Sequence, residues 1–231
     1  MKSKNGLMAV VLSVAIVLSG CSSMSKSLKG GLLGGGAGAA LGAGVGALIG
    51  KNAKGAAIGA GIGAAVGATT GAIIGRKMDK AAAQAAAIEG ARVDSIRDAN
   101  NLKALRVTFD SGILFQTGKS TLNAASKDAL SKFAKILVAN PTMDIAIMGH
   151  TDNVGSLEVN QKLSQDRAQA VADFLKTQNV AASQLKEIVG KNFSEPVGDN
   201  NTKAGQKANR RVEVYMYASE KMINDTQAQV K

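Results

Sequence analysis

Apolar residues recur with the spacing of an α-helix in two stretches of the second half of the chain. Between residues 121 and 141, the positions i, i+3, i+4 and i+7 of one stripe are Leu130, Phe133, Ala134 and Leu137. Pro141 stands just past the end of this predicted helix. Further along, Ser164 offers an N-cap to a second helix, whose inner stripe is Ala168, Val171, Phe174 and Leu175.

Shorter β-rich stretches surround these two helices. Residues 91–109 predict two strands around an Asp-Ala-Asn-Asn turn, and further strands are expected at 143–150, 185–190 and 210–218. In the last strand Val212, Val214 and Met216 alternate with Glu213, Tyr215 and Tyr217. The order of strands and helices predicts a two-layer α/β (α+β) sandwich, with the helices on one face of a mixed sheet.

Glycine recurs every four residues in the first half of the chain, from Gly34 to Gly50 and again from Gly55 to Gly75. This period places each set of glycines along one helix face, where small residues let two helices approach closely in lipid. Each run is about as long as a membrane's hydrocarbon core is thick. We therefore expect a helical hairpin over 31–75, in or on a membrane and able to form a homo-oligomer; the alternative is a flexible Gly/Ala linker.

The composition changes near residue 76. Residues 76–91 have high helix propensity and predict a solvent-exposed helical stalk. Residues 92–218 are then long enough for one folded domain with a single core. A C-terminal tail is expected at 219–231.

The N-terminus has the pattern of a secretory signal. Two lysines precede an apolar run that is short for a membrane span, and Leu-Ser-Gly-Cys follows. These four residues resemble the lipobox of bacterial lipoproteins, which implies cleavage of residues 1–20, acylation of Cys21, and a lipid anchor and tether over 21–30. Ser22, in place of aspartate, then implies the outer membrane. The alternative is an ordinary signal with an incidental thiol.

The chain is basic, with a formal net charge of +11, and 3% of its residues are aromatic. A basic protein favours anionic partners. Nucleic acid is not expected, because an exported chain meets none and few aromatic residues are present to stack on bases. Lipid phosphates and the carboxylates of peptidoglycan are the acidic partners available in a cell envelope.

A resemblance to a known family is carried by three segments: ILFQTGKSTL, GHTDNVGSLEVNQKLSQDRAQAVADFL and SEPVGDNNTKAGQKANRRVEV. Together they resemble the OmpA-like peptidoglycan-binding domain, named after outer membrane protein A. The resemblance implies noncovalent binding to the diaminopimelate of the stem peptide through Asp152 and Arg167, supported by Thr151 and Asn160. Gln116 stands where family members commonly have an aspartate, and Val159 stands where an aromatic residue is frequent.

The same residues suggest a binding site on physical grounds. If the second helix begins near Ser164, Arg167 lies in its first turn, where a cation opposes the helix dipole unless a carboxylate docks there. Asp152 ends the preceding strand and can face an ammonium group. The alternative is that Asp152 and Arg167 pair with each other and pin the loop.

The residues also allow catalytic alternatives to be weighed. His150 is the only histidine, so no zinc site is predicted, and no cofactor is expected. Spacing along the chain leaves a Ser-His-Asp triad open, since such residues assemble in space. A wall-cleaving hydrolase would need two carboxylates, for which Asp152 and Glu158 are the local pair.

We instead expect a structural role for His150, and a protein that is not an enzyme but binds peptidoglycan and tethers the outer membrane. A glycine-zipper pore positioned by the wall domain is a third alternative.

Overall fold

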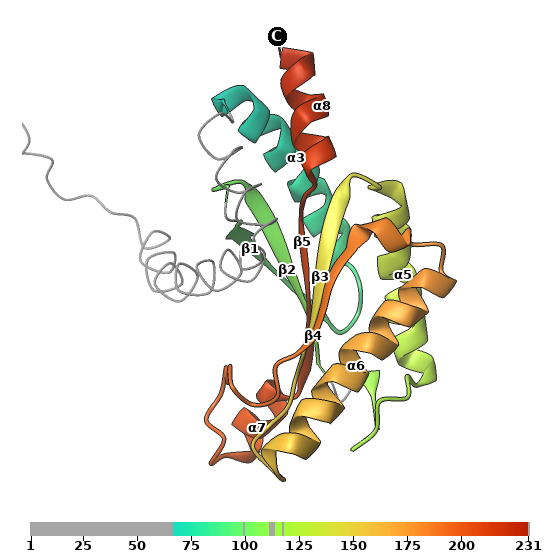
Figure 1. The fold of residues 1–231 in the computed structure, drawn as a ribbon, viewed down its shortest axis with the longest axis vertical. Coiled ribbons are helices and arrows are strands. Elements are labelled where there is room, and N and C mark those ends of the chain that lie inside the picture. Colours follow the sequence, from blue (N-terminus) through green and yellow to red (C-terminus); the bar gives the residue numbers. More distant parts are fainter. Residues whose placement is uncertain (1–66, 99, 111–113, 117, 231) are drawn as a thin grey trace, which may run out of the picture. The chain divides into compact units, whose positions relative to one another are not determined.

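The computed structural model describes residues 67–230, except 99, 111–113 and 117. The predicted signal peptide, Cys21 and most of the predicted glycine hairpin lie outside these residues. Eleven elements follow one another along the described chain (Figure 1): α3 (Ala68–Ala86), β1 (Ala91–Arg97), β2 (Lys103–Asp110), α5 (Ala124–Ala139), β3 (Met143–His150), α6 (Leu157–Thr177), the short 3-10 helix η1 (Ala182–Gln184), β4 (Leu185–Gly190), α7 (Lys203–Asn209), β5 (Arg211–Ala218) and α8 (Glu220–Val230).

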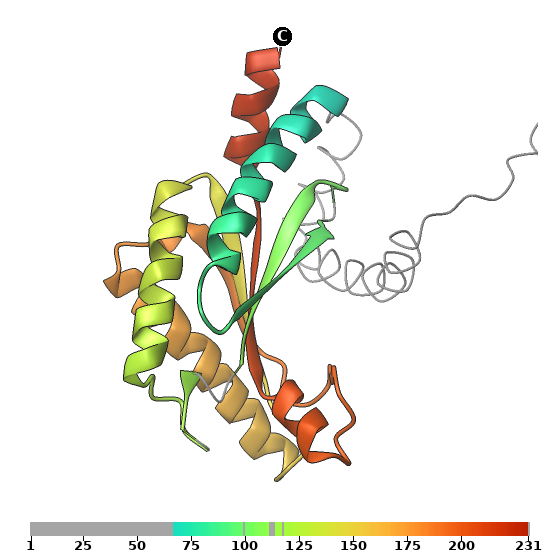
Figure 2. The same cartoon turned by 180° about the vertical axis from the view of Figure 1, so that it is seen from behind.

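The five strands form one mixed sheet in the order β1-β2-β5-β3-β4. All neighbouring pairs are antiparallel except β3 and β4, which are parallel. Helices α3, α5 and α6 share one apolar core with the strands and cover one face of the sheet (Figures 1 and 2). The predicted two-layer sandwich is confirmed, as are the two strands around the turn and the helix with Leu130, Phe133, Ala134 and Leu137 on its buried face.

The central strand β5 has no exposed residue. Val212, Val214 and Met216 enter the core beneath the helices. On the other face, Tyr215 and Tyr217 join a smaller apolar cluster with residues of the neighbouring strands, namely Ile96, Ala104, Ala146 and Met148. The alternation seen in the sequence therefore separates two buried faces of β5. One face is covered by the helices, and the other is covered by side chains of the neighbouring strands.

The prediction for the start of the second helix is wrong by two turns. The helix α6 begins at Leu157, and the Ser156 hydroxyl caps it by accepting a hydrogen bond from the Val159 amide at 3.3 Å. Ser164 is a buried residue within α6, and its hydroxyl donates to the Gln161 carbonyl. Arg167 thus lies in the middle of a helix, so the helix-dipole argument does not apply to it.

The predicted stalk is helical as far as Ala86, but the prediction that it is exposed to solvent is wrong. One face of α3 is fully buried in the domain core, through Ile74, Met78, Ala81 and Ala85. The alanine-rich run gave a weak apolar pattern, yet small side chains let α3 pack closely on the sheet. Gly71 and Gly75 also belong to α3, so the predicted hairpin boundary at residue 75 falls inside this helix.

The predicted C-terminal tail is a helix. Met222, Ile223 and Thr226 of α8 are buried, and α8 lies beside α3 in both views of the fold (Figures 1 and 2). Within the described part of the chain, no helix is both long and apolar enough to cross a membrane.

Asp144 is expected to make the stability of the domain depend on pH. Burial raises the pKa of this β3 carboxyl from 3.8 to about 6, although Lys186 lies 3.7 Å away. The pKa of Asp144 is higher in the folded protein than in the unfolded chain. Ionisation of Asp144 therefore destabilises the fold increasingly as the pH rises from 3.8 to about 6, and this cost persists at higher pH. Asp144→Asn should therefore raise the free energy of unfolding by about 1 to 2 kcal/mol at pH 7.5, with no gain at pH 3.5, in urea titrations.

The exposed pair of Asp225 and Lys221 on α8 supplies the control. Asp225→Asn should change stability little at either pH. Equal stability of Asp144→Asn and the parent protein at pH 7.5 would contradict the assigned cost of ionising Asp144.

Candidate functional site

The candidate site lies where β3 ends and β5 begins. These strands are antiparallel neighbours, and His150 at the end of β3 pairs with Arg211 at the start of β5. The residues that follow His150 therefore meet the residues that precede Arg211. This register brings Asp152 and Arg210 together, although 58 positions separate them along the chain.

Asp152 is nearly buried and has two partners. Its Oδ1 accepts a hydrogen bond from the Val154 amide at 3.2 Å, and its Oδ2 accepts one from Nη1 of Arg210 at 2.5 Å. The Arg210 side chain keeps 36% of its surface exposed. The ion pair of Asp152 is therefore formed with Arg210, in contrast to the alternative in which Asp152 and Arg167 pair with each other.

Arg167 is a buried cation with few partners. It is 2% exposed, its Nε donates to the Lys119 carbonyl at 3.1 Å, and its guanidinium lies 5.2 Å from the centre of the Phe115 ring. Its Nη1 has no hydrogen-bond partner among the described residues. A buried polar group without a partner is costly, so this guanidinium is well suited to receive an anion.

The electrostatics place Arg167, Arg210 and Asp152 in one site. Burial and, to a smaller extent, the positive charge of Arg210 lower the pKa of Arg167 to about 10, whereas Asp152 acts in the opposite direction. Two cations and one carboxylate thus influence one another here. The site has an excess of positive charge and favours an anionic group near Arg167.

Two glycines allow α6 to carry Arg167 against the sheet. A Cβ atom on Gly149 of β3 would lie 2.1 Å from the Ser164 carbonyl oxygen, and one on Gly190 of β4 would lie 2.4 Å from the Gln165 amide nitrogen. Such distances are far inside van der Waals contact. Hydrogen bonds then lock the helix in place: the Gln165 side chain accepts from the Gly190 amide at 2.7 Å and the Gln161 side chain donates to the Gly190 carbonyl at 2.8 Å.

The two predicted supporting residues lie in the same loop region. Asn160 is buried and donates to the carbonyls of Val154 and Ser156, at 2.9 and 3.2 Å. The Thr151 amide donates to the Asn192 carbonyl at 2.9 Å. Asn160 therefore holds the loop between β3 and α6 in shape, and Thr151 ties the end of β3 to the loop after β4.

Arg210 is positioned by its two neighbours in sequence. Asn209 is fully buried, and its side-chain oxygen accepts from the amides of Val197 and Gly198 at 2.7 and 2.8 Å. Arg211 donates to the carboxylate of Glu213 at 2.7 Å. With both neighbours held, the backbone of Arg210 is fixed at the start of β5, from where its side chain reaches Asp152.

His150 lies beneath the site and not on its surface. It is 1% exposed, and its Nε2 is 3.7 Å from the Glu213 carboxylate. Burial lowers the pKa of His150, although Glu213 opposes this shift, so the imidazole is neutral at physiological pH. Glu158, the second carboxylate considered for a hydrolase, is exposed in the first turn of α6.

The structure adds residues that the sequence did not single out for the site. Arg210, Phe115 and the Lys119 carbonyl are not among the site residues that the sequence predicts. The register of β3 and β5 could have indicated Arg210, because it precedes a strand that pairs with the strand before Asp152. Gln116 is exposed on the same loop as Phe115.

Two segments of the chain match known protein families. Residues 114–210 match the OmpA family, and residues 1–79 match the YMGG-like Gly-zipper family. The segment that matches the OmpA family, called the OmpA family domain here, contains Asp152, Arg167 and Arg210. The resemblance inferred from the sequence motifs is confirmed, and the glycines with a period of four fall within the Gly-zipper match.

Two curated relatives of the OmpA family domain are outer-membrane lipoprotein YfiB of Pseudomonas aeruginosa and probable lipoprotein YiaD of Escherichia coli. The first is 39% identical over 110 residues, covering 48% of this chain and 65% of that protein. The second is 33% identical over 127 residues, covering 55% of this chain and 56% of that protein. In both cases the match spans less than two thirds of the relative.

Among solved structures, the OmpA family domain is similar to the cell wall anchor of the T6SS from Pseudomonas aeruginosa. The TM-score is 0.51 at 27% identity, covering 62% of this chain and 97% of that one. A putative MotB-like protein from Desulfovibrio vulgaris, with a TM-score of 0.53 and 19% identity over 64% of this chain and 91% of that one, shares the fold.

Proposed function

We propose that this protein is an outer-membrane lipoprotein whose OmpA family domain binds peptidoglycan noncovalently and tethers the outer membrane to the cell wall. The observation that carries the proposal is the buried guanidinium of Arg167, beside the Asp152–Arg210 pair, with an Nη1 that has no partner in the part of the chain that the structure describes. The names of its relatives agree with this function. Besides the two lipoproteins, they include the peptidoglycan-binding protein ArfA of Mycobacterium bovis, 35% identical over 48% of this chain and 34% of that protein.

The proposed ligand is the free amino-acid end of diaminopimelate in the stem peptide. This group carries one ammonium and one carboxylate, and the site offers an anionic arm and cationic arms for them. Arg167 receives the carboxylate and Asp152 receives the ammonium. Because Arg210 holds Asp152 in the free protein, the ammonium must share that carboxylate with Arg210 or displace it.

Thr151 and Asn160 support these two ligands by holding the strand end and the loop on which Asp152 lies. Two charge-assisted bonds contribute roughly 3 to 6 kcal/mol, which corresponds to a dissociation constant of about a millimolar or weaker. Weak binding at one site is sufficient here, because a membrane anchor confines the domain next to a polymer with dense repeats.

Binding fits the site better than cleavage. A glycosidase needs one carboxyl group that is protonated at working pH and a second that is close to it. Asp152 is instead bound to Arg210, and Glu158 is an exposed residue of α6. The relatives reported above are lipoproteins and a peptidoglycan-binding protein.

The lipid anchor and the glycine segment are part of the proposal. Cys21, which lies outside the described residues, is the acylation site, so that residues 1–20 are removed and 21–30 form the tether. The glycine zipper then precedes a folded domain that extends from α3 to α8, and it is the segment available for homo-oligomer contacts. Mass spectrometry of the mature N-terminus tests the anchor, because an unmodified Cys21 would contradict it.

The placement of the domain supports tethering. The start of α3 and the end of α8 lie at one end of the sheet, whereas the start of α6 and α7 lie at the opposite end (Figures 1 and 2). The chain therefore enters the domain far from the Asp152–Arg210 pair. A domain that is attached to the membrane through the chain before α3 can present the site at its opposite end to the wall.

Co-sedimentation with purified sacculi tests the proposed function. The chain from residue 21 onward, with Cys21→Ser to remove acylation, should be retained on sacculi and be released by free diaminopimelate. Retention should weaken as ionic strength rises, since charged contacts are screened. Absence of retention would contradict the proposal, and release of soluble muropeptides would favour the hydrolase.

A further inference from the structure

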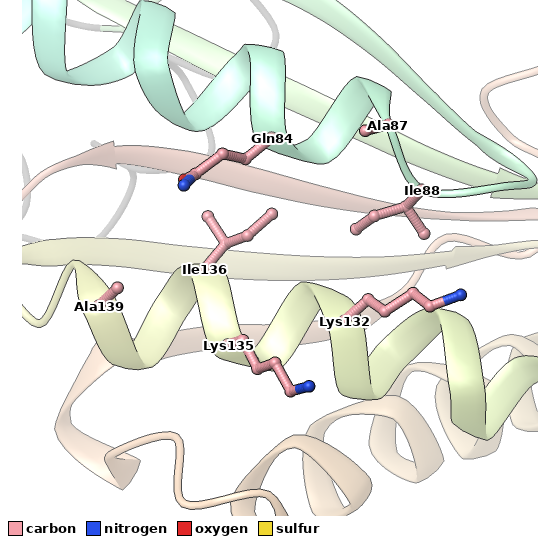
Figure 3. Close-up of a pocket in the computed structure, with 7 residues that line it drawn as sticks. All are labelled: Gln84, Ala87, Ile88, Lys132, Lys135, Ile136 and Ala139. Carbon is pink, nitrogen blue, oxygen red and sulfur yellow. The ribbon is translucent and has the colours of Figure 1, made fainter.

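A groove lies on the helical side of the domain, away from the Asp152–Arg210 pair. It lies between the C-terminal halves of α3 and α5 and has a volume of about 280 Å³. Ile88 and Ile136 point into the space between the two helices, while Lys132 and Lys135 extend from α5 (Figure 3). Apolar side chains thus form the floor of a groove with a cationic rim.

Positive charge is concentrated on the two helices that form the groove. Both have a net charge of +2: α3 has Arg76, Lys77 and Lys80 against Asp79, and α5 has Lys127, Lys132 and Lys135 against Asp128. The other two long helices, α6 and α8, have no excess of positive charge. In α6 three basic residues balance three acidic ones, and α8 has one basic residue against two acidic ones.

Acidic residues compensate part of this charge, among them Glu89, which follows Ile88 and acts on Lys132 together with Asp128. Asp79 pairs with Lys103 of the sheet, and Asp128 pairs with Lys132 at 2.6 Å. Lys135, by contrast, has no ion pair or hydrogen bond within the described ranges and stands on the exposed side of α5. An anionic partner would meet an uncompensated ammonium at this position.

We propose that this groove contacts the anionic phospholipid surface of the membrane to which the protein is anchored. Lysines keep their ammonium groups at phosphate level while their alkyl stems cover apolar surface, which is the arrangement at a membrane interface. The isoleucine floor can take the glycerol and first acyl carbons of a lipid. No aromatic residue is available in the groove to stack on a sugar ring, and no arginine to hold a carboxylate in bidentate fashion.

The contact is peripheral and separate from wall binding. It would hold the domain against the inner leaflet by its helices, with the Asp152–Arg210 pair free at another part of the fold. The domain could then exchange between a membrane-bound position and the wall.

Flotation with vesicles tests the proposal, using the chain from residue 21 onward with Cys21→Ser so that no acyl chain contributes. The chain should associate with equimolar phosphatidylethanolamine and phosphatidylglycerol and much less with phosphatidylethanolamine and phosphatidylcholine. Lys132→Gln with Lys135→Gln should weaken partition to the anionic vesicles about tenfold, because each lysine near such a surface contributes measurably. The matched variant on α6, Lys162→Gln with Lys176→Gln, should partition like the parent.

A local probe locates the contact. In the Cys21→Ser chain, Ala139→Cys is the only thiol, and an environment-sensitive fluorophore there should shift to the blue with anionic vesicles, whereas one at Asp173→Cys should not. An unshifted Ala139 probe, or equal partition of the groove variant and the parent, would overturn the proposal. Loss of sacculus retention by the groove variant, with vesicle binding intact, would also overturn it and assign the groove to the wall.

Discussion

Replacing Arg167 by methionine is expected to abolish retention on sacculi without weakening the fold. Methionine fills similar space against Phe115 but cannot receive a carboxylate. Loss of one charge-assisted contact of about 1.5 to 3 kcal/mol lowers affinity roughly ten- to a hundred-fold. Among the described residues the buried guanidinium has one hydrogen bond, to the Lys119 carbonyl, so its removal should change the free energy of unfolding by about 1 kcal/mol or less.

The two measurements are co-sedimentation with sacculi and urea unfolding of the same preparations. Lys162→Met is the control, because Lys162 lies on the same helix but is exposed and paired with Asp166. Asp152→Asn should also lose retention, since the amide cannot balance an ammonium group. A folded Arg167→Met, Asp152→Asn double variant that still binds sacculi would refute the assigned site, whereas an unfolded Arg167→Met variant would assign Arg167 a structural role.

Gly149→Ala is expected to damage both stability and binding. The new Cβ would lie 2.1 Å from the Ser164 carbonyl oxygen, which is backbone and cannot rotate away. The helix α6 must therefore shift outward, at a cost of about 3 kcal/mol in the free energy of unfolding. Because Arg167 is three residues further along α6, the shift also moves it from its place beside Arg210, and sacculus retention should fall with stability.

Gly75→Ala provides a matched control on α3. A Cβ at Gly75 would meet nothing within 4 Å, and alanine favours a helix over glycine by about 1 kcal/mol. This variant should unfold at a higher urea concentration than the parent and retain sacculus binding. A Gly149→Ala variant as stable as the parent would show that this glycine does not set the distance between α6 and the sheet.

Much of the fold was determined by local pattern. The strands over 143–150 and 185–190 and the helix with Phe133 on its inner face follow directly from alternation and from the helical period, because burial on one face selects those periods. The family motifs likewise pointed to Asp152 and Arg167. The structure places both residues in one electrostatic site, next to a partner at Arg210.

Other features required the tertiary structure. Ser156 and Ser164 are both acceptable helix caps in isolation, and the choice of Ser156 depends on the packing of α6 against Gly149 and Gly190. The alanine-rich α3 is equally compatible with solvent and with a core, and only the presence of the sheet and α8 beside it decides between them.

The pairing of Asp152 with Arg210 was likewise decided in three dimensions. A carboxylate selects among nearby cations by geometry, and distance along the sequence does not indicate which cation is near. The antiparallel register of β3 and β5 brings Arg210 to Asp152 and leaves the buried Arg167 without a carboxylate partner of its own. Local sequence determined the strands, the helix α5 and the candidate residues, whereas long-range packing decided which charges meet, because a charge pair forms between neighbours in space.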